Sequence, residues 1–470
     1  MAATAPPDVR ASLGRFGALP AWLAGAVDPD LIGAVLARHE PGLAIRGVTA
    51  KRLRLKGDGS AWTGRYQVTA AGPDGAVREV ALTGTLHPPA AAPAADDATA
   101  APFGTAGWRR ILPELGLELA PAPGDEVALP TLPALTDPER ARALLEEQIR
   151  AAAPAYAGLR LAGCTPRVVR YKPGSRCTIL YDLAYPPGAH GPQLVAAKTY
   201  GGEKGRNAWD GMRALWKSPL AAGDVVTIAE PLAYVPELRV LLQGPVPEQR
   251  TLKELIRSAL DAGTPEALAE LDAAMDRTAA GLAALHASGV EYGEPVTIDD
   301  ELDEIRGVLR AMAVSVPELA DAAGPLLTRV TELAARHPGD PAVPAHRSFR
   351  PAQVLLHDDR IGFIDFDGIC QTEPAIDVAL FVSSVKGLGL VDRNVDPAAY
   401  DQQLGQLERI CGRFLERYRA LAPISRERVA LWETLDLLTD VMHAWTKVKP
   451  SKLPPAMLLL ERHLEVSGLA

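Results

Sequence analysis

The sequence predicts an α+β protein with a small β-rich lobe, then a large helical lobe, and an extra N-terminal α/β unit ahead of both. Two observations carry this prediction. Up to about residue 245, short runs rich in Val, Ile, Tyr and Thr alternate with Gly/Pro turns, as strands do. From Thr251 onward, apolar residues recur at helical spacing, interrupted by two short β segments within residues 353–366. At 470 residues the chain has room for two or three folded units.

The N-terminal unit is predicted to span residues 1–88. Asp28 is a candidate N-cap of a helix, and three strand-like runs follow it, VTAKRLRLK, AWTGRYQVTA and VREVALTGTL, separated by GDG and GPDG turns. Residues 89–104 are predicted to be an Ala/Pro-rich linker, because they offer too little large apolar surface to fold.

The β-rich lobe is predicted to span residues 105–245 and the helical lobe residues 246–470. In the β-rich lobe, TPRVVRYKPGSRCTILYDLAY is a strand, a turn and a returning strand, and QLVAAKTY is a third strand. The same order occurs in residues 1–88, where RLKGDGS superimposes on RYKPGSR. This similarity indicates a degenerate internal repeat.

Composition argues against several classes of protein. A net charge of -9 argues against a general surface for nucleic acid or anionic membranes. The four cysteines form no CxxC pair and no His/Cys cluster, so we expect them to be buried apolar residues and not metal ligands or disulfides. No stretch of 18 uninterrupted apolar residues occurs. We therefore expect a cytoplasmic protein without nucleic-acid or membrane partners.

Three residues make a candidate site. Lys198 lies inside an apolar strand and must reach solvent or an anion, because burying it unpaired is costly. A lysine on an edge strand would meet the same need through solvent. Gln353 and Asp365 flank a short predicted hairpin, with Asp365 in the apolar run IGFIDF. Their side-chain oxygens suit a magnesium ion bound against the phosphates of a nucleotide.

These residues resemble a known pattern. A strand lysine, a connector, then H-x-D-x-x-x-x-N and an I-D-F/W segment are typical of the aminoglycoside phosphotransferase (APH) and choline-kinase-like family, relatives of protein kinases. The similarity covers about residues 165–420. It implies a bilobal protein-kinase-like fold that binds ATP and Mg2+. Lys198 would contact the α- and β-phosphates, Asp365 would hold the metal, and Gln353 would take the place of the family's Asn.

The resemblance leaves two features of the nucleotide site open. The turn at residues 171–176 stands where a phosphate-covering loop would lie, and Lys172 and Arg176 would then add positive charge beside the phosphates; they are equally well explained as solvated turn residues. Glu203 and Asp210 are both candidates for the acidic helix partner of Lys198, and neither has the usual spacing.

Ser348 occupies the position of the family's catalytic Asp, two residues after His346. A serine hydroxyl is no general base near neutral pH, and a general base contributes about 10²–10⁴-fold to such a reaction. Three interpretations follow. The protein transfers phosphate from ATP to a hydroxyl of a small molecule or peptide, with His346 or Asp367 as the base or with none. Alternatively, it is a pseudokinase that binds a ligand or regulates a partner protein. In the third, Ser348 itself accepts a group, although the sequence shows no activating base beside it.

Overall fold

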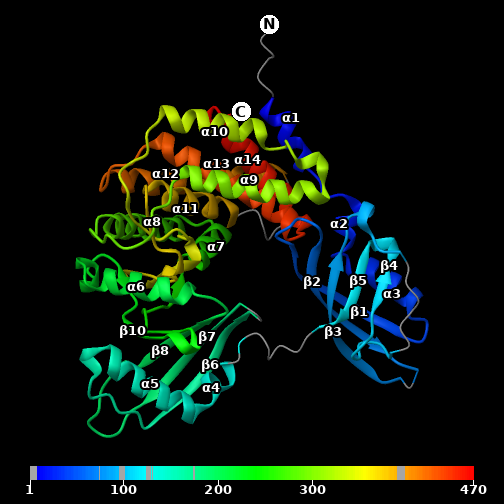
Figure 1. Ribbon diagram of the computed structural model, residues 1–470. Coiled ribbons are helices and arrows are strands. Elements are labelled where there is room, and N and C mark those ends of the chain that lie inside the picture. The colour runs from blue at the N-terminus through cyan, green and yellow to red at the C-terminus, as the bar shows by residue number, and fades with distance from the viewer. Residues whose placement is uncertain are drawn as a thin grey trace. The chain divides into compact units, whose positions relative to one another are not determined.

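The computed structural model describes residues 8–73, 75–94, 101–122, 129, 131–172, 175–388 and 397–469 (Figure 1). The chain forms two compact units. The first unit comprises residues 1–123, 298–337 and 434–470, and the second unit comprises residues 124–297 and 338–433. This division corrects the sequence-based boundaries. Two short strands beyond residue 105 complete the sheet of the first unit, and two parts of the predicted helical lobe belong to that unit as well.

The first unit is built on a five-stranded antiparallel sheet with strand order β1-β2-β3-β5-β4. Its strands are β1 (Ala44–Leu55), β2 (Trp62–Ala71), β3 (Val77–Leu86), β4 (Arg110–Leu112) and β5 (Leu117–Pro121). Its helices are α1 (Val9–Leu13), α2 (Ala21–Gly25), α3 (Pro29–His39), α9 (Ile298–Ser315), α10 (Gly324–Arg336), the C-terminal part of α13 (Arg426–Thr446) and α14 (Leu453–Ser467). Asp28 caps α3 by accepting hydrogen bonds from the backbone N–H groups of Asp30 and Leu31, as the sequence predicts.

One segment, Val9–His39, is long and apolar enough to cross a membrane by length and composition alone. In the structure it is divided into α1, α2 and α3, which have separate caps. Several of its apolar side chains, including Leu23, Val35 and Leu36, are buried, whereas Leu31 is exposed. The burial of these side chains explains why the segment contains so many apolar residues.

The turn between β1 and β2 packs directly on α9. Gly59 has φ +74°, and a Cβ atom there would lie 1.9 Å from the carbonyl oxygen of Ala311. The hydroxyl of Ser315 also donates a hydrogen bond of 2.5 Å to the carbonyl oxygen of Gly59. Gly59→Ala is therefore expected to lower the free energy of unfolding by about 2–4 kcal/mol, through backbone strain and a steric clash.

Urea unfolding followed by tryptophan fluorescence measures this effect. Gly57→Ala is the matched control, because nothing lies within 4 Å of a Cβ atom at Gly57 and its φ is negative. Equal stability of the two variants would show that the turn does not pack on α9 as described.

The second unit contains a second five-stranded antiparallel sheet, with strand order β10-β11-β8-β7-β6 (Figure 1). Its strands are β6 (Gly163–Lys172), β7 (Arg176–Ala184), β8 (Leu194–Tyr200), β10 (Pro231–Val235) and β11 (Val240–Gln243). Three helices accompany it: α4 (Leu132–Thr136), α5 (Pro138–Ala152) and α6 (Lys204–Trp216). Leu145 and Ile149 of α5 pack in one buried cluster with Ile179, Val195 and Ala197 of the sheet. This cluster is the core of the β-rich lobe.

Both sheets have the same topology. In each, three consecutive strands form a meander, and the fifth strand lies between the third and the fourth. The last two strands are joined in both cases by Pro-Glu-Leu in a single 3-10 turn, Pro113–Leu115 and Pro236–Leu238. A residue with positive φ, Gly116 or Arg239, follows each turn. This correspondence supports the internal repeat that the sequence indicates.

The helical lobe of the second unit contains α7 (Leu252–Ala262), α8 (Pro265–His286), α11 (Ala375–Leu388), α12 (Pro397–Arg419) and the start of α13. Its short strands are β9 (Thr227–Ile228), β12 (Arg250–Thr251), β13 (Val343–Ala345), β14 (Val354–His357), β15 (Arg360–Phe363) and β16 (Cys370–Thr372). The four cysteines are free and buried, as predicted. A β-rich lobe followed by a helical lobe confirms the predicted α+β, bilobal fold, with the N-terminal unit added.

Candidate active site

The second sheet presents three polar side chains on one face. Successive residues of a strand point to opposite faces. Val195 and Ala197 of β8 point into the core beneath α5, so Lys198 and Tyr200 belong to the other face. Arg176 of β7 is paired with Tyr200 in the sheet register, and Thr178 is paired with Lys198. Since β8 lies between β7 and β11, Lys198 is on an inner strand, which excludes the edge-strand explanation.

The β14–β15 hairpin brings the predicted metal ligands together. The backbone N–H of Ile364 donates to the carbonyl oxygen of Gln353 at 3.1 Å, so Gln353 and Asp365 flank the open end of the hairpin. The observed strand is shorter than the predicted segment IGFIDF, since β15 ends at Phe363. Asp365 follows it with φ +77°, a left-handed conformation that is uncommon outside glycine and is concentrated at functional sites.

Lys198, Arg176, Asp365 and Asp367 form one ionic cluster. The Nζ atom of Lys198 lies 2.8 Å from Oδ1 of Asp365 and 3.8 Å from Oδ1 of Asp367. Arg176 lies 4.0 Å from Asp365 and 3.8 Å from Asp367, measured from Nη1 to Oδ2. The hydroxyl of Tyr200 donates a hydrogen bond of 2.8 Å to Asp367. Two carboxylates are thus matched by two cations at one site.

The two carboxylates differ in proton affinity. Burial by itself raises the pKa of Asp365, but the charge and hydrogen bond of Lys198, with Arg176 and His346, outweigh burial and hold this pKa well below its usual range. Burial and the neighbouring Asp365 carboxylate outweigh the attraction of Lys198, so the pKa of Asp367 is raised. Asp365 therefore loses its proton at lower pH than Asp367 does.

The acidic partner of Lys198 is Asp365, assisted by Asp367. Neither helix candidate pairs with the lysine. Asp210 forms an ion pair with Arg206 at 2.7 Å, and Glu203 forms one with Arg239 at 3.1 Å. Helix α6 instead contributes Asn207, whose amide donates to the carbonyl oxygens of Asp367 and Ile369 and so fixes the turn that carries both carboxylates.

Gln353 shows a feature expected of a metal ligand. Its side-chain oxygen is buried and has no hydrogen-bond partner, an uncommon state that asks for an explanation. The described residues contain no group of three or more His, Cys, Asp or Glu side chains arranged to hold a metal. Magnesium, however, needs only one or two protein oxygens together with substrate phosphates. The unsatisfied oxygen of Gln353 and the ionised carboxylate of Asp365 fit that requirement.

Ser348 and His346 are hydrogen-bonded to each other. Nε2 of His346 lies 3.0 Å from the carbonyl oxygen of Ile364, which only accepts, so Nε2 carries the proton. In the neutral ring Nδ1 is then an acceptor, and the hydroxyl of Ser348 lies 3.1 Å from it. The sequence showed no activating base beside Ser348, and the structure corrects that reading. Arg347, between the two residues, has φ +58°.

A buried carboxylate holds this segment in place. Asp377 of α11 is fully buried and accepts a hydrogen bond of 2.6 Å from the backbone N–H of His346. It also lies 3.1 Å from Nε2 of His286, whose Nδ1 lies 2.6 Å from the hydroxyl of Tyr418. His286 is thus a buried, hydrogen-bonded residue of the core, and Asp377 holds the segment that carries His346 and Ser348.

Several predicted and unpredicted residues can now be placed. Arg176 is in the cluster, whereas Lys172 ends β6 opposite Arg176 in the register, and Pro173 and Gly174 of the turn lie outside the described residues. Tyr200 and Asn207 were not predicted from the sequence. Tyr200 carries a signal, since it is two residues after Lys198 on the same strand face. Asn207 carries none, because its partners are backbone carbonyl groups distant in sequence.

Comparison with protein-family models matches residues 220–421 to the phosphotransferase enzyme family, APH. The matched stretch is therefore similar to that family over less than half of the chain. The matched residues include His346, Ser348, Gln353 and Asp365, whereas Arg176 and Lys198 precede them. This match confirms the resemblance found in the sequence.

Solved structures similar to the chain include three kinds of kinase. A glucosamine kinase in complex with glucosamine, ADP and inorganic phosphate is 19% identical, covers 94% of this chain and 99% of its own, and has a TM-score of 0.45. A choline/ethanolamine kinase family protein from Mesorhizobium loti is 16% identical, covers 70% and 97%, and has a TM-score of 0.42. A streptomycin-ATP-APH(2")-IIa ternary complex is 12% identical, covers 66% and 94%, and has a TM-score of 0.42. No curated protein matches the sequence.

Proposed function

We propose that the second unit transfers the γ-phosphoryl group of ATP to a hydroxyl of a small molecule, with Ser348 and His346 together replacing the general base. The observation that carries this proposal is the hydrogen bond between the Ser348 hydroxyl and Nδ1 of His346. In family members with an Asp at this position, a carboxylate would accept the proton of the acceptor hydroxyl. In this chain the Ser348 hydroxyl would take the proton first, and the imidazole of His346 is hydrogen-bonded to that hydroxyl.

The proton would move in two linked steps. The acceptor hydroxyl attacks the γ-phosphorus and gives its proton to the Ser348 oxygen as ADP leaves. Ser348 passes its own proton to Nδ1 of His346, which leaves an imidazolium. His346 and Asp365 attract each other electrostatically, so the ionised Asp365 stabilises that cation. The buried, carbonyl-bound ring keeps Nδ1 directed at Ser348 throughout.

Binding of ATP would use the ionic cluster. Lys198 and Arg176 would contact phosphate oxygens, and Gln353 and Asp365 would hold magnesium. When bound, the metal would neutralise charge that develops on the phosphates during transfer. Because positioning and electrostatics supply most of the acceleration of phosphoryl transfer, these four residues carry the larger part of the proposed activity. We also propose that the protein acts in the cytoplasm.

The alternative is a pseudokinase that binds nucleotide or another ligand and serves a partner protein. It shares the ionic cluster but gives no role to the bond between Ser348 and His346. The two functions therefore differ in whether the natural protein, with Ser348 in place, transfers phosphate. Restoring a carboxylate to a site in which only the base is altered should preserve or increase transfer.

The experiment is a transfer assay with γ-labelled ATP and magnesium. The acceptors would be sugars, amino sugars, aminoglycosides and choline. We expect one class to be phosphorylated by the natural protein, with release of ADP. Lack of transfer by the natural protein across the panel, despite normal binding of Mg-ATP, would contradict the proposal and favour the pseudokinase, above all if Ser348→Asp is active.

A further inference from the structure

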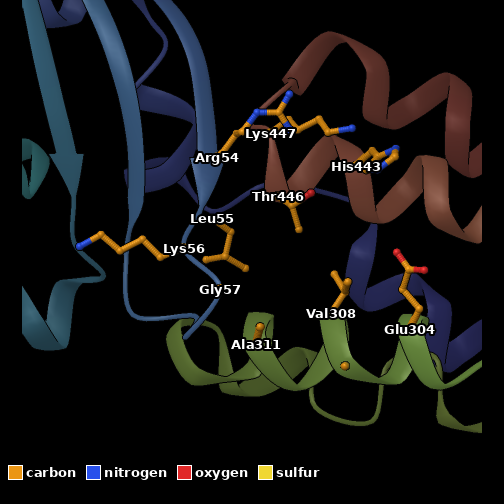
Figure 2. A pocket seen from close by; sticks show the side chains of 11 residues that line it. Arg54, Leu55, Lys56, Gly57, Glu304, Val308, Ala311, His443, Thr446 and Lys447 are labelled. Atoms are coloured by element: carbon orange, nitrogen blue, oxygen red, sulfur yellow. The ribbon is translucent and has the colours of Figure 1, made fainter. Parts of the chain in front are cut away.

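The first unit has a pocket of about 410 Å³ that the proposed kinase chemistry does not use. It is lined by the end of β1 and its turn, by α9 and by the C-terminal end of α13 (Figure 2). Arg54 and Lys447 lie along one side, and His443 and Glu304 lie toward the other, with Leu55, Val308, Ala311 and Thr446 between them. Lys56 borders the pocket, but its side chain is turned away.

The β1–β2 turn at this pocket corresponds to the β6–β7 turn of the active site. Each turn joins the first two strands of a sheet with the same topology. Arg54 and Arg170 follow a register irregularity at matching places, between Lys51 and Arg54 in β1 and between Val168 and Arg170 in β6. Strand β7 begins at Arg176, which lies beside the carboxylates. In the first unit, Arg54 at the matching place and Lys447 after α13 line the pocket.

The walls of the pocket are held by specific contacts. Gly59 is packed against Ala311, and Ser315 donates a hydrogen bond to its carbonyl oxygen, which ties the turn to α9. At the opposite wall, Val448 has φ +48° and is buried, although a β-branched residue is strongly disfavoured in that conformation. This strained residue follows Lys447 directly and fixes where the chain leaves α13. Strain of this kind is concentrated at functional sites.

The positive charges around the pocket repel one another. Burial, Lys452 and Arg54 all lower the pKa of Lys449, which lies two residues after Lys447. Lysines just beyond the end of a helix are stabilised by the helix dipole, and this explains part of the charge at Lys447 and Lys449. It does not explain Arg54, which lies on a strand of the sheet. Cations from two different parts of the chain, Arg54 of β1 and Lys447 after α13, therefore lie at one side of the pocket.

We propose that this pocket binds a small phosphate ester of a polyol. Arg54 and Lys447 would bind the phosphate, since charge-assisted hydrogen bonds to phosphate are among the strongest that side chains make. The carboxylate of Glu304 would accept hydrogen bonds from the hydroxyl groups of the ligand, and His443 and Thr446 would form further hydrogen bonds with them. Leu55, Val308 and Ala311 would contact the carbon skeleton. The site is separate from the kinase residues, all of which belong to the second unit, and the proposal holds whether or not that unit transfers phosphate.

Calorimetric titration of the full-length protein tests this site. The probes are glucose 6-phosphate, inorganic phosphate and glucose. We expect glucose 6-phosphate to bind more tightly than inorganic phosphate, and glucose not to bind. The double substitution Arg54→Gln and Lys447→Gln should weaken binding of glucose 6-phosphate by about tenfold or more, because both phosphate contacts are lost. Lys56→Gln is the matched control, and it should leave binding unchanged.

A second variant separates this pocket from the kinase site. Asp365→Asn alters the ionic cluster of the second unit and should leave glucose 6-phosphate binding as it is. Three results would overturn the proposal: no binding at millimolar probe, unchanged binding in the double variant, or loss of binding in Asp365→Asn alone. Equal affinity for inorganic phosphate and glucose 6-phosphate would overturn the polyol part, because Glu304 and His443 would then contribute nothing. Melting temperatures close to that of the natural protein confirm that each variant is folded.

Discussion

Replacing Asp365 by Asn is expected to abolish magnesium-dependent ATP binding and to lower phosphoryl transfer by about 10³-fold, which corresponds to several kcal/mol of lost metal and charge stabilisation. Asp365 is the carboxylate that Lys198 contacts at 2.8 Å. Its pKa is lowered by that contact, whereas the pKa of Asp367 is raised by burial. An amide at this position keeps the shape of the side chain but removes its charge. ATP titration and a transfer assay measure both effects.

Asp359→Asn is the matched control for this substitution. Asp359 lies in the exposed turn of the same hairpin and should tolerate the change. Asp367→Asn should have a smaller effect than Asp365→Asn, since Lys198 is closer to Asp365. Normal Mg-ATP binding by Asp365→Asn would show that the nucleotide site has been placed wrongly.

The effect of Asp365→Asn on the free energy of unfolding is predicted to depend on pH. The folded-state pKa of Asp365 is depressed, so its ionisation stabilises the folded protein above the pKa of the unfolded chain, about 4. This stabilisation is lost as pH falls through the folded-state pKa. Asp365→Asn should therefore be less stable than the natural protein at neutral pH. The difference between the two free energies of unfolding should shrink below about pH 4.

Ser348→Ala is expected to lower kcat by about 10²–10⁴-fold with little change in the KM for ATP, because it removes the path from the acceptor hydroxyl to His346. Ser348→Thr is the conservative control, since it keeps the hydroxyl group. Ser348→Asp should retain activity or gain it. Because a carboxylate ordinarily loses its proton at lower pH than an imidazole does, the acid limb of the pH–rate profile should also move to lower pH.

His346→Gln separates the proposed proton path from a purely structural role of Ser348. It removes the terminal proton acceptor and leaves the serine in place, so its loss of kcat should resemble that of Ser348→Ala. The double variant should then lose little more than either single variant, because both residues act on one proton. Full activity of Ser348→Ala would refute the relay. A mass increase of one phosphate on Ser348 after incubation with ATP would instead support covalent use of the serine.

The candidate site was only partly predictable from sequence. Lys198, Gln353 and Asp365 could be found because their neighbours and spacing follow a motif. The partner of Lys198 could not, because the two helix acids pair with local arginines and the contact with Asp365 joins residues far apart in the chain. The bond between Ser348 and His346 depends on the positive φ of Arg347 and on the proton position that Ile364 imposes. Residue type alone specifies neither.

The fold shows a similar division. The meanders of both sheets follow from alternating apolar residues and clear turns, and the N-cap of α3 follows from Asp28. The boundary at residue 105 failed because β4 and β5 are short and lie beyond an Ala/Pro-rich segment. Helices α9, α10 and α14 have amphipathic patterns that predict a buried face. Such patterns do not identify which of two cores a helix packs against.

The central claim is that the second unit has a magnesium-dependent ATP site built on Lys198, Asp365 and Gln353. Calorimetric titration of the purified protein with ATP, with magnesium and then with EDTA, tests it most directly. We expect binding that is strong with magnesium and much weaker without it. Absence of binding at millimolar ATP in the presence of magnesium, by a protein with a normal melting transition, would contradict the claim.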